Sequence, residues 1–303
     1  MSCQLGGDRI DVNQLVLSRD PESLKRLAKT GFEFVFRQEN QAPARSLAES
    51  ARVSIQGFDP SKIDAIIVVS SIFDSAPSWA QEVAGALGVP ASTDIIRVQE
   101  ACTGYVTAVA LADGLLQSGR SEEVLIVTFD NYSAYMSGDL SLEILFSDAL
   151  TLSTASKSFP KSHVPINALQ LHLKRELSVN KRASESDLNI VRDKLQMNGA
   201  GVFQFAIDSV PKLVNKCLAD IQLSSTEVDW YLHQGSKFVV DQLSRTLELE
   251  SDSLFRAGAY GNTVSGSIPF QLMSAAPRGK YLGLVGFGMG LSAKVSVYEI
   301  ENN

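Results

Sequence analysis

Two runs of β-branched residues constrain the folding of this 303-residue chain most strongly. They occupy residues 63–71 (IDAIIVVSS) and 124–129 (VLIVTF), and continuous runs of this kind are typical of strands that are covered on both faces. Residues 78–87 have helical spacing, and residues 102–118 are apolar nearly all round, which predicts a central buried helix. Buried strands that alternate with helices indicate a layered α/β architecture.

The second half of the chain repeats this alternation of elements. The pattern predicts, in order, a helix over 201–221 with Pro211 inside it, a strand over 228–232, a helix over 238–247, and a hairpin of 281–287 with 293–298. A helix over 43–56 and a short strand over 95–98 are expected in the first half. The chain length fits two domains of about 150 residues, or one large duplicated domain.

Composition excludes several classes of function. With 45% hydrophobic and 20% charged residues the chain is ordinary globular protein. A net charge of −7 argues against nucleic acid as the main partner, because phosphate binding requires a basic face. No signal-peptide pattern or membrane-spanning run is visible. The three cysteines have neither disulfide nor zinc-like spacing, so we expect no metal and a reducing cytoplasm.

Cys102 lies between the short strand and the apolar helix, in the sequence EACTGY. At the start of a helix, the positive end of the helix dipole lowers the pKa of a thiol and favours the nucleophilic thiolate. Taken by itself, a cysteine in an apolar helix is more often a small core residue. The position therefore makes Cys102 a candidate nucleophile and leaves a structural role open.

Three later segments carry further candidate residues. His233 ends an apolar strand, and strand ends in α/β sheets are where ligands bind; a half-buried structural histidine is the alternative. Asn262 lies in YGNTVSGSIP, which alone is compatible with a simple turn. Residues 286–292 (GFGMGLS) join two strands and open no helix, so they suit a turn that presents N–H groups to an oxyanion better than a phosphate loop.

In this order and at these spacings, the segments resemble the β-ketoacyl-acyl carrier protein synthase III family of the thiolase fold, over most of the chain. Other stretches are similar to family motifs: residues 64–71, 101–104, 146–149, 197–206, 233–234, 260–263, 267–269 and 286–292. The resemblance implies a layered αβαβα fold of two similar halves. Residues 1–160 would carry the cysteine nucleophile, and residues 161–303 the histidine and the asparagine.

The resemblance also implies a mechanism. Cys102 would accept an acyl group as a thioester. His233 and Asn262 would donate hydrogen bonds to the malonyl thioester oxygen, stabilising the enolate that forms as carbon dioxide leaves. The backbone N–H groups of Cys102 and Met289 would hold the oxyanion when the carbanion attacks the acyl group. No metal or redox cofactor is implied. The product would be a β-ketoacyl thioester of fatty acid or polyketide-type biosynthesis.

Two rival functions remain open. Some relatives transfer the acyl group from the cysteine to a hydroxyl or an amine, often with an acid in place of the asparagine, and Asn262 argues against this reading. Other relatives are non-catalytic partner subunits, which an intact set of Cys102, His233 and Asn262 disfavours. The identity of the acyl primer cannot be derived from the sequence.

The chain also departs from the family pattern. The tryptophan that stacks on the coenzyme A adenine in the family is absent near residues 20–23, and its arginine partner is not recognisable around residues 138–143. Arg97 and Glu100 place charges where the family is acidic or small. Ala76, near the position of a bulky gate in the acyl tunnel, would leave room for a longer or branched primer. These departures suggest a specialised pathway enzyme.

The absent adenine clamp suggests a carrier protein rather than coenzyme A as donor for at least one acyl group. Carrier proteins are acidic, so docking on this acidic chain requires a local basic rim. The candidates are Lys212, Lys216, Lys237, Arg245 and Arg256. The family also implies a homodimer.

Overall fold

The computed structural model describes residues 1–38, 43–54, 58–71, 78–136, 138–156, 188–191, 194–249 and 254–299. Its larger sheet has five strands in the order β1-β7-β6-β4-β5. The strands are β1 (Ser2–Leu5), β4 (Ala65–Val69), β5 (Asp94–Val98), β6 (Glu123–Asp130) and β7 (Ala149–Ser156). β4 runs parallel to β5 and β6, whereas β7 is antiparallel to β6 and β1. Every residue of β4 is buried, as its continuous apolar sequence predicts.

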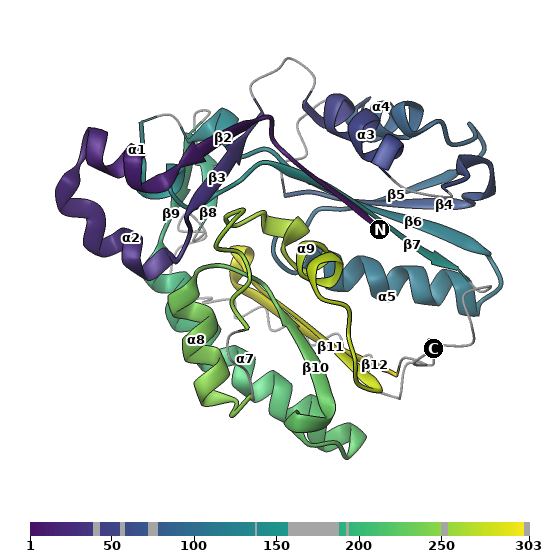
Figure 1. The fold of residues 1–303 in the computed structure, drawn as a ribbon. Coiled ribbons are helices and arrows are strands. Elements are labelled where there is room, and N and C mark those ends of the chain that lie inside the picture. The colour runs from purple at the N-terminus through teal and green to yellow at the C-terminus, as the bar shows by residue number, and fades with distance from the viewer. Residues whose placement is uncertain are drawn as a thin grey trace.

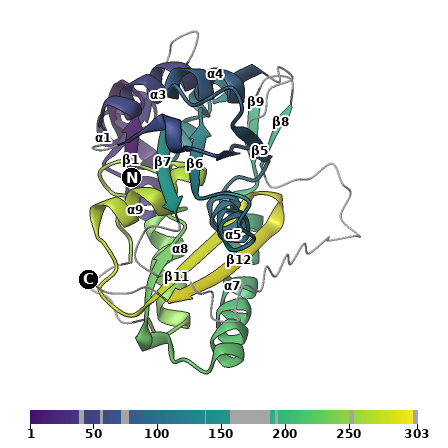
Figure 2. The ribbon, with the colours of Figure 1, turned by 90° about the vertical axis from the view of Figure 1, so that its right-hand side faces the viewer.

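Helices cover both faces of this sheet (Figure 1). On one face, α3 (Pro43–Ser54) and α4 (Ser78–Leu87) pack on β4, β6 and β7 in one apolar cluster. On the other face lies α5 (Gly104–Gln117), whose apolar side chains contact both this sheet and the second one. α5 therefore forms the central layer of the molecule, together with α9 (Ser267–Ser274), as Figure 2 also shows.

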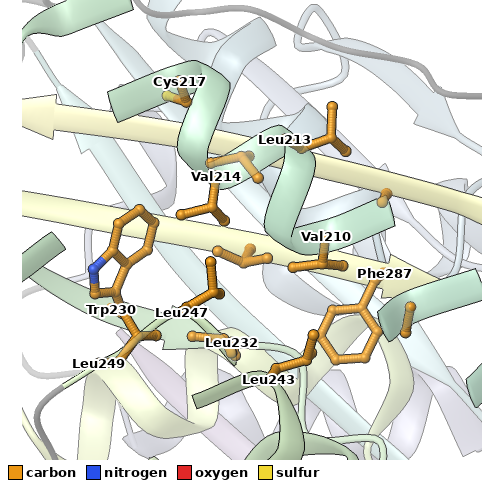
Figure 3. Close-up of a cluster of buried hydrophobic side chains, with 14 of the residues drawn as sticks. Val210, Leu213, Val214, Cys217, Trp230, Leu232, Leu243, Leu247, Leu249 and Phe287 are labelled. Carbon is orange, nitrogen blue, oxygen red and sulfur yellow. The ribbon is translucent and has the colours of Figure 1, made fainter. Parts of the chain in front are cut away.

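The second sheet has the order β10-β11-β12. Its strands are β10 (Val228–Leu232), β11 (Tyr281–Gly288) and β12 (Ser292–Glu299), with β10 and β11 parallel and β11 and β12 antiparallel. The outer face of the sheet is covered by α7 (Gly199–Ile221) and α8 (Lys237–Thr246). Val210 and Val214 of α7, Leu243 of α8 and Phe287 of β11 meet in the apolar core drawn in Figure 3. The layers thus alternate as helix, sheet, helix, sheet, helix.

Smaller elements complete the fold. The N-terminal region adds a two-stranded sheet of β2 (Asp8–Asp11) and β3 (Phe34–Arg37), joined through α1 (Val12–Arg19) and α2 (Leu24–Thr30). A second ribbon pairs β8 (Leu188–Val191) with β9 (Lys194–Met197), and α6 spans Leu140–Glu143. Single 3₁₀ turns occur at Pro21–Ser23, Pro60–Lys62, Ser133–Tyr135, Ser225–Glu227, Val264–Gly266 and Met289–Leu291. Within the described ranges, no helix combines the length and apolarity needed to cross a membrane.

The predicted elements of both sheets occur, with shifts of one to two residues at most of their ends. The start of the central helix differs from the prediction in a way that affects the site. The helix was expected from residue 102, but α5 starts at Gly104, so Cys102 lies in the preceding turn. The helix expected over 43–56 ends at Ser54, and residues 55–57 lie outside the described part. The predicted boundary between the halves, at residue 160, also falls outside the described residues.

Candidate active site

Cys102 lies in the turn between β5 and α5 and is almost entirely buried. The amide of Gly104 donates to the carbonyl of Ala101 across this turn, at 2.9 Å. The helix that follows has no side-chain cap at Thr103. Thr103 and Gly104 therefore form the start of α5, and Cys102 lies just before the helix.

The turn between β11 and β12 approaches the sulfur closely. Gly288 has a φ of 144°, and a Cβ built on it would stand 2.9 Å from the Sγ atom of Cys102. Only glycine fits here, because an L side chain would be strained and would meet the sulfur. The next residue, Met289, hydrogen-bonds through its backbone to the Cys102 thiol.

Burial dominates the ionisation of this thiol. It raises the pKa of Cys102 to about 12, although backbone hydrogen bonds from Met289 and from Cys102 itself act in the opposite direction. The charge of Asp130 adds to the rise. The expectation of a lowered thiol pKa is therefore wrong for the resting protein, because loss of water outweighs the two backbone hydrogen bonds. The two amides that oppose the rise are the pair predicted to form the oxyanion hole.

His233 follows directly on β10 and is 3% exposed. Its backbone N–H donates to Val285 of the neighbouring strand β11 at 2.8 Å, and its ring meets Phe287 edge-on. Burial lowers the pKa of the imidazole to about 3, so the ring is neutral at physiological pH. The structure gives its Nδ1 atom no hydrogen-bond partner among the described residues. A neutral ring of this kind can donate one hydrogen bond and accept another.

Asn262 is held by backbone bonds on both sides. Its N–H donates to Leu145, and its carbonyl accepts from the N–H of Ser147. Its side-chain oxygen Oδ1 accepts from the N–H of Val264 at 2.9 Å. With Oδ1 engaged in this way, the amide group presents Nδ2, a donor, to its surroundings. This orientation is what stabilisation of an enolate oxygen requires.

Val264 connects the three candidate residues. It belongs to the same buried cluster as Cys102, with Met289 packed against that cluster. It also hydrogen-bonds Asn262 and contacts His233 through its backbone. Its φ of 53° lies in the left-handed region, which is rare for a β-branched residue. The fold thus brings the predicted cysteine, histidine and asparagine to one strained turn.

Asp130, at the end of β6, is a residue of this region that the sequence analysis missed. Its buried carboxylate accepts from the N–H and Oγ groups of Ser71 and from those of Ser265. Burial raises the pKa of Asp130, and these four donors act against the rise. Asp130 thereby anchors Ser265, which directly follows Val264. No local pattern marks this role, because it depends on three segments that meet only in the fold.

A polar pocket of about 700 Å³ is lined by residues of the N-terminal region, of the segment 135–144 and of β9. Its walls include Asp20 and Ser23 on one side and the segment 138–141 on the other. These are the two stretches in which the sequence analysis found no adenine clamp. Met136 and Leu195 line the pocket and also belong to the apolar cluster that contains Cys102, whereas Cys102 itself is not among the lining residues.

The predicted basic rim is only partly available. Lys212 and Lys216 of α7 are exposed, as are Lys237 and Arg245 of α8. Lys216 and Lys237 pair with Asp220 and Asp241, one helical turn further on and each at 2.6 Å.

Arg256 differs from the other rim residues. It is half-buried and stacks over the ring of Tyr231, which makes it the least accessible member of the set. Ala76, the predicted tunnel residue, lies outside the described residues. In the part of the chain that is described, no group of three His, Cys, Asp or Glu residues could hold a metal ion.

Comparison with known proteins gives a consistent result. The family model for 3-oxoacyl-(acyl-carrier-protein) synthase III matches residues 96–158, and the model for its C-terminal part matches residues 218–300. Cys102 lies in the first of these segments, and His233, Asn262 and Met289 lie in the second.

Two relatives carry the name beta-ketoacyl-(acyl-carrier-protein) synthase III. The protein of Porphyra umbilicalis is 30% identical over 258 residues, which cover 80% of this chain and 78% of the relative. That of Synechocystis is 27% identical over 279 residues, which cover 86% of this chain and 83% of the relative.

A solved structure, 3-oxoacyl-(acyl carrier protein) synthase III from Pseudomonas aeruginosa, superimposes with a TM-score of 0.84 at 21% identity. The match covers 99% of this chain and 96% of the other. This likeness and the order of the layers confirm the expected αβαβα fold of the thiolase type.

Proposed function

This chain belongs to the β-ketoacyl-acyl carrier protein synthase III family, and on that premise we propose that it catalyses a decarboxylative Claisen condensation. An acyl group bound to Cys102 would react with a malonyl thioester, carried by acyl carrier protein, to give a β-ketoacyl product of fatty acid or polyketide-type biosynthesis. One observation carries the proposal most directly. The Asn262 amide is locked with its oxygen on Val264, which leaves its N–H₂ group as a donor.

The first half-reaction forms the acyl-enzyme. The Cys102 sulfur attacks the carbonyl carbon of the acyl thioester, the carbon–sulfur bond to the carrier breaks, and the proton of the Cys102 thiol passes to the departing carrier sulfur. Negative charge develops on the carbonyl oxygen, and the amides of Cys102 and Met289 are the groups placed to receive it. These amides act on the sulfur in the resting protein. The same two donors would thus stabilise first the thiolate and then the oxyanion.

The second half-reaction forms the carbon–carbon bond. The malonyl carboxylate leaves as carbon dioxide, and the electrons of the broken bond move into an enolate. His233 and Asn262 would hold the enolate oxygen. The carbanion attacks the acyl carbonyl, the Cys102 sulfur leaves, and the β-ketoacyl thioester is released with its carrier. Burial of both donors supports this role, because hydrogen bonds to a developing charge are stronger where water is excluded.

Labelled substrates test this proposal and its main rival. The purified protein is incubated with a panel of acyl thioesters, peptide mapping locates the thioester, and release of labelled carbon dioxide from malonyl carrier protein is followed. We expect acylation of Cys102 alone and carbon dioxide release in step with β-ketoacyl product. Acylation followed by transfer to a hydroxyl or an amine, without carbon dioxide, would favour the acyltransferase reading. A protein that is never acylated would be a non-catalytic partner subunit.

The acyl donor is proposed to arrive on a carrier protein. The absence of the adenine clamp near residues 20–23 and 138–143 supports this, and the pocket at these two stretches is lined by charges of both signs, from Asp20, Asp139 and Arg19. Docking would use the exposed cations Lys212 and Arg245, together with Lys237, which would have to exchange its partner Asp241 for the carrier. The double variant Lys212→Glu with Lys237→Glu should weaken carrier-dependent turnover in a salt-sensitive way. Equal activity with both donors, unaffected by the reversals, refutes this part of the proposal.

Assembly and location complete the proposal. We expect a homodimer, as the family resemblance implies; β5 lies at the edge of its sheet, and of its five residues two are exposed and two are half-buried. Light scattering at micromolar concentration tests this, and a mass of about one 32.8 kDa chain would contradict it. The three cysteines are free thiols, which supports a reducing compartment such as the cytoplasm.

A further inference from the structure

An ion pair between a buried lysine and a partly exposed glutamate lies close to the candidate nucleophile in the chain. Lys294 of β12 has a side chain that is 2% exposed, and its Nζ atom contacts both carboxylate oxygens of Glu100, at 2.6 and 2.7 Å. Glu100 precedes Cys102 by two residues. Lys294 therefore joins the strand that follows the Met289 turn to the segment that carries Cys102. The pair connects the two halves of the fold at the active site.

Hydroxyl groups extend this pair on both sides. Thr107 of α5 and Thr103, which adjoins Cys102, both donate to Glu100 Oε2, at 2.7 and 3.1 Å. The Thr103 hydroxyl also lies 3.2 Å from that of Ser292. Ser292 in turn donates to the carbonyl oxygen of Met289 at 3.0 Å. These groups line up from Lys294 to Met289, the residue whose amide acts on the sulfur. Since each hydroxyl has one proton, the Thr103–Ser292 contact is a hydrogen bond only while one of the two hydroxyls turns away from its other acceptor.

The backbone geometry depends on the same region. Gly286 pairs with Lys294 across the hairpin, and a Cβ on Gly286 would stand 2.7 Å from the carbonyl oxygen of Cys102. The hairpin and the nucleophile segment are therefore in direct contact, with no side chain between them at this point. A small sliding of one past the other would move the Met289 amide away from the reacting atoms.

Stability alone is a poor reason for such a cluster. Such an ion pair contributes little net stability, because the loss of water from the buried ammonium offsets much of its attraction to the partly hydrated carboxylate. The pair does fix the position of β12, which carries Lys294, relative to the segment of Glu100 and Cys102. We propose that Lys294 and Glu100 are positioning residues, which hold the Met289 amide in register with Cys102 for the acyl-transfer step. This inference rests on the proposed function of Cys102.

The variant Lys294→Met separates positioning from simple stability. Methionine keeps most of the buried length, and the carboxylate left behind is 28% exposed and can be hydrated. Two reactions of Cys102 are compared below the melting temperature. Acylation by an acyl thioester forms an oxyanion, whereas alkylation by iodoacetamide requires only the thiolate. We expect acylation to slow about tenfold or more, short of the roughly 10²–10³ that loss of an oxyanion donor costs, and alkylation to slow by much less.

Three controls make the result decisive. Lys280→Met is the same substitution at an exposed ion pair with Glu299 on the same sheet, and should change neither rate. Ser292→Ala removes the link to Met289 without uncovering a buried charge; it should give the same pattern with a smaller fall, and it replaces Lys294→Met if that variant does not fold. Wild-type protein shows first whether Cys102 is acylated at all, and a negative result there overturns the proposed function itself.

Other outcomes overturn the positioning role alone. With acylation of the wild type established, a Lys294→Met rate equal to that of Lys280→Met would show that the pair does not position the amide. An equal fall of acylation and alkylation would mean that only ionisation of the thiol has changed. Faster alkylation would mean that the site has opened, which is a purely structural effect.

Discussion

The backbone of Met289 hydrogen-bonds to the thiol of Cys102, although the two residues belong to different halves of the chain. Gly288 makes this contact possible, since any Cβ there would meet the sulfur. The nucleophile is therefore not activated by its own helix alone. The Met289 amide, in the turn between β11 and β12, would stabilise both the thiolate of Cys102 and the oxyanion that forms on the acyl carbonyl oxygen when the sulfur attacks.

The resting thiol of Cys102 should be unreactive near neutral pH. With its pKa raised to about 12 by burial, alkylation by iodoacetamide should be slow at pH 7 and should rise about tenfold per pH unit through pH 9, without a plateau. Mass spectrometry of a Cys3→Ser and Cys217→Ser background isolates this single thiol. A plateau below pH 8 would show a preformed thiolate and would restore the simple helix-dipole account.

His233 and Asn262 should matter mainly in the second half-reaction. His233→Ala and Asn262→Ala should still form acyl-Cys102, but should lose carbon dioxide release by about 10²–10³, the usual effect of removing one such donor. Asn262→Asp keeps the shape and places a carboxylate beside the enolate, so it should abolish condensation and spare acylation. Rapid-quench assays of each step measure the split. Loss of acylation in His233→Ala would instead make the unpartnered imidazole nitrogen the base for the thiol.

Burial of neutral His233 should make the fold sensitive to acid. The pKa of His233 is about 3 in the folded protein and near 6.5 when unfolded, so below pH 6.5 the unfolded chain binds a proton that the folded chain does not. Stability is therefore lost as pH falls, by up to about 1.4 kcal/mol per pH unit. Urea unfolding of wild type and His233→Gln at pH 7, 6 and 5 isolates this contribution. A stability difference that stays constant over this range would mean that the imidazole is not buried in its neutral form.

Gly288→Ala should abolish acylation and destabilise the protein. The added methyl group would lie 2.9 Å from the Cys102 sulfur, on a backbone with φ of 144°, so the turn must move. Gly114→Ala in α5 is the matched control, because nothing lies within 4 Å of its Cβ position; it should be neutral or stabilise by about 0.5–1 kcal/mol. Thermal unfolding and acylation assays compare the two. Near-normal acylation in Gly288→Ala would exclude the close contact as a requirement of the site.

Local patterns predicted β4, β5 and β6 of the larger sheet and all three strands of the second, because each depends on neighbouring residues, whereas β1 and β7 were not predicted. The β-branched run of β4 is buried on both faces, and the apolar sequence of α5 does place it between the sheets. Residues 1–38 were less informative. Their short strands and helices have mixed polarity, so the sequence analysis assigned no element there, whereas the structure has β1–β3, α1 and α2.

The residues of the site were predictable by type and order, but their chemical state was not. Cys102, His233 and Asn262 could be selected from motifs in one sequence, since each motif is local. The rise in the Cys102 pKa, the neutrality of His233 and the anchoring role of Asp130 all come from burial by distant segments. Glu100, recognised in the sequence only as an unexpected charge, acquires its partner Lys294 from the last strand. Charge energies depend on surrounding solvent and on distances in space, so only the tertiary structure could decide them.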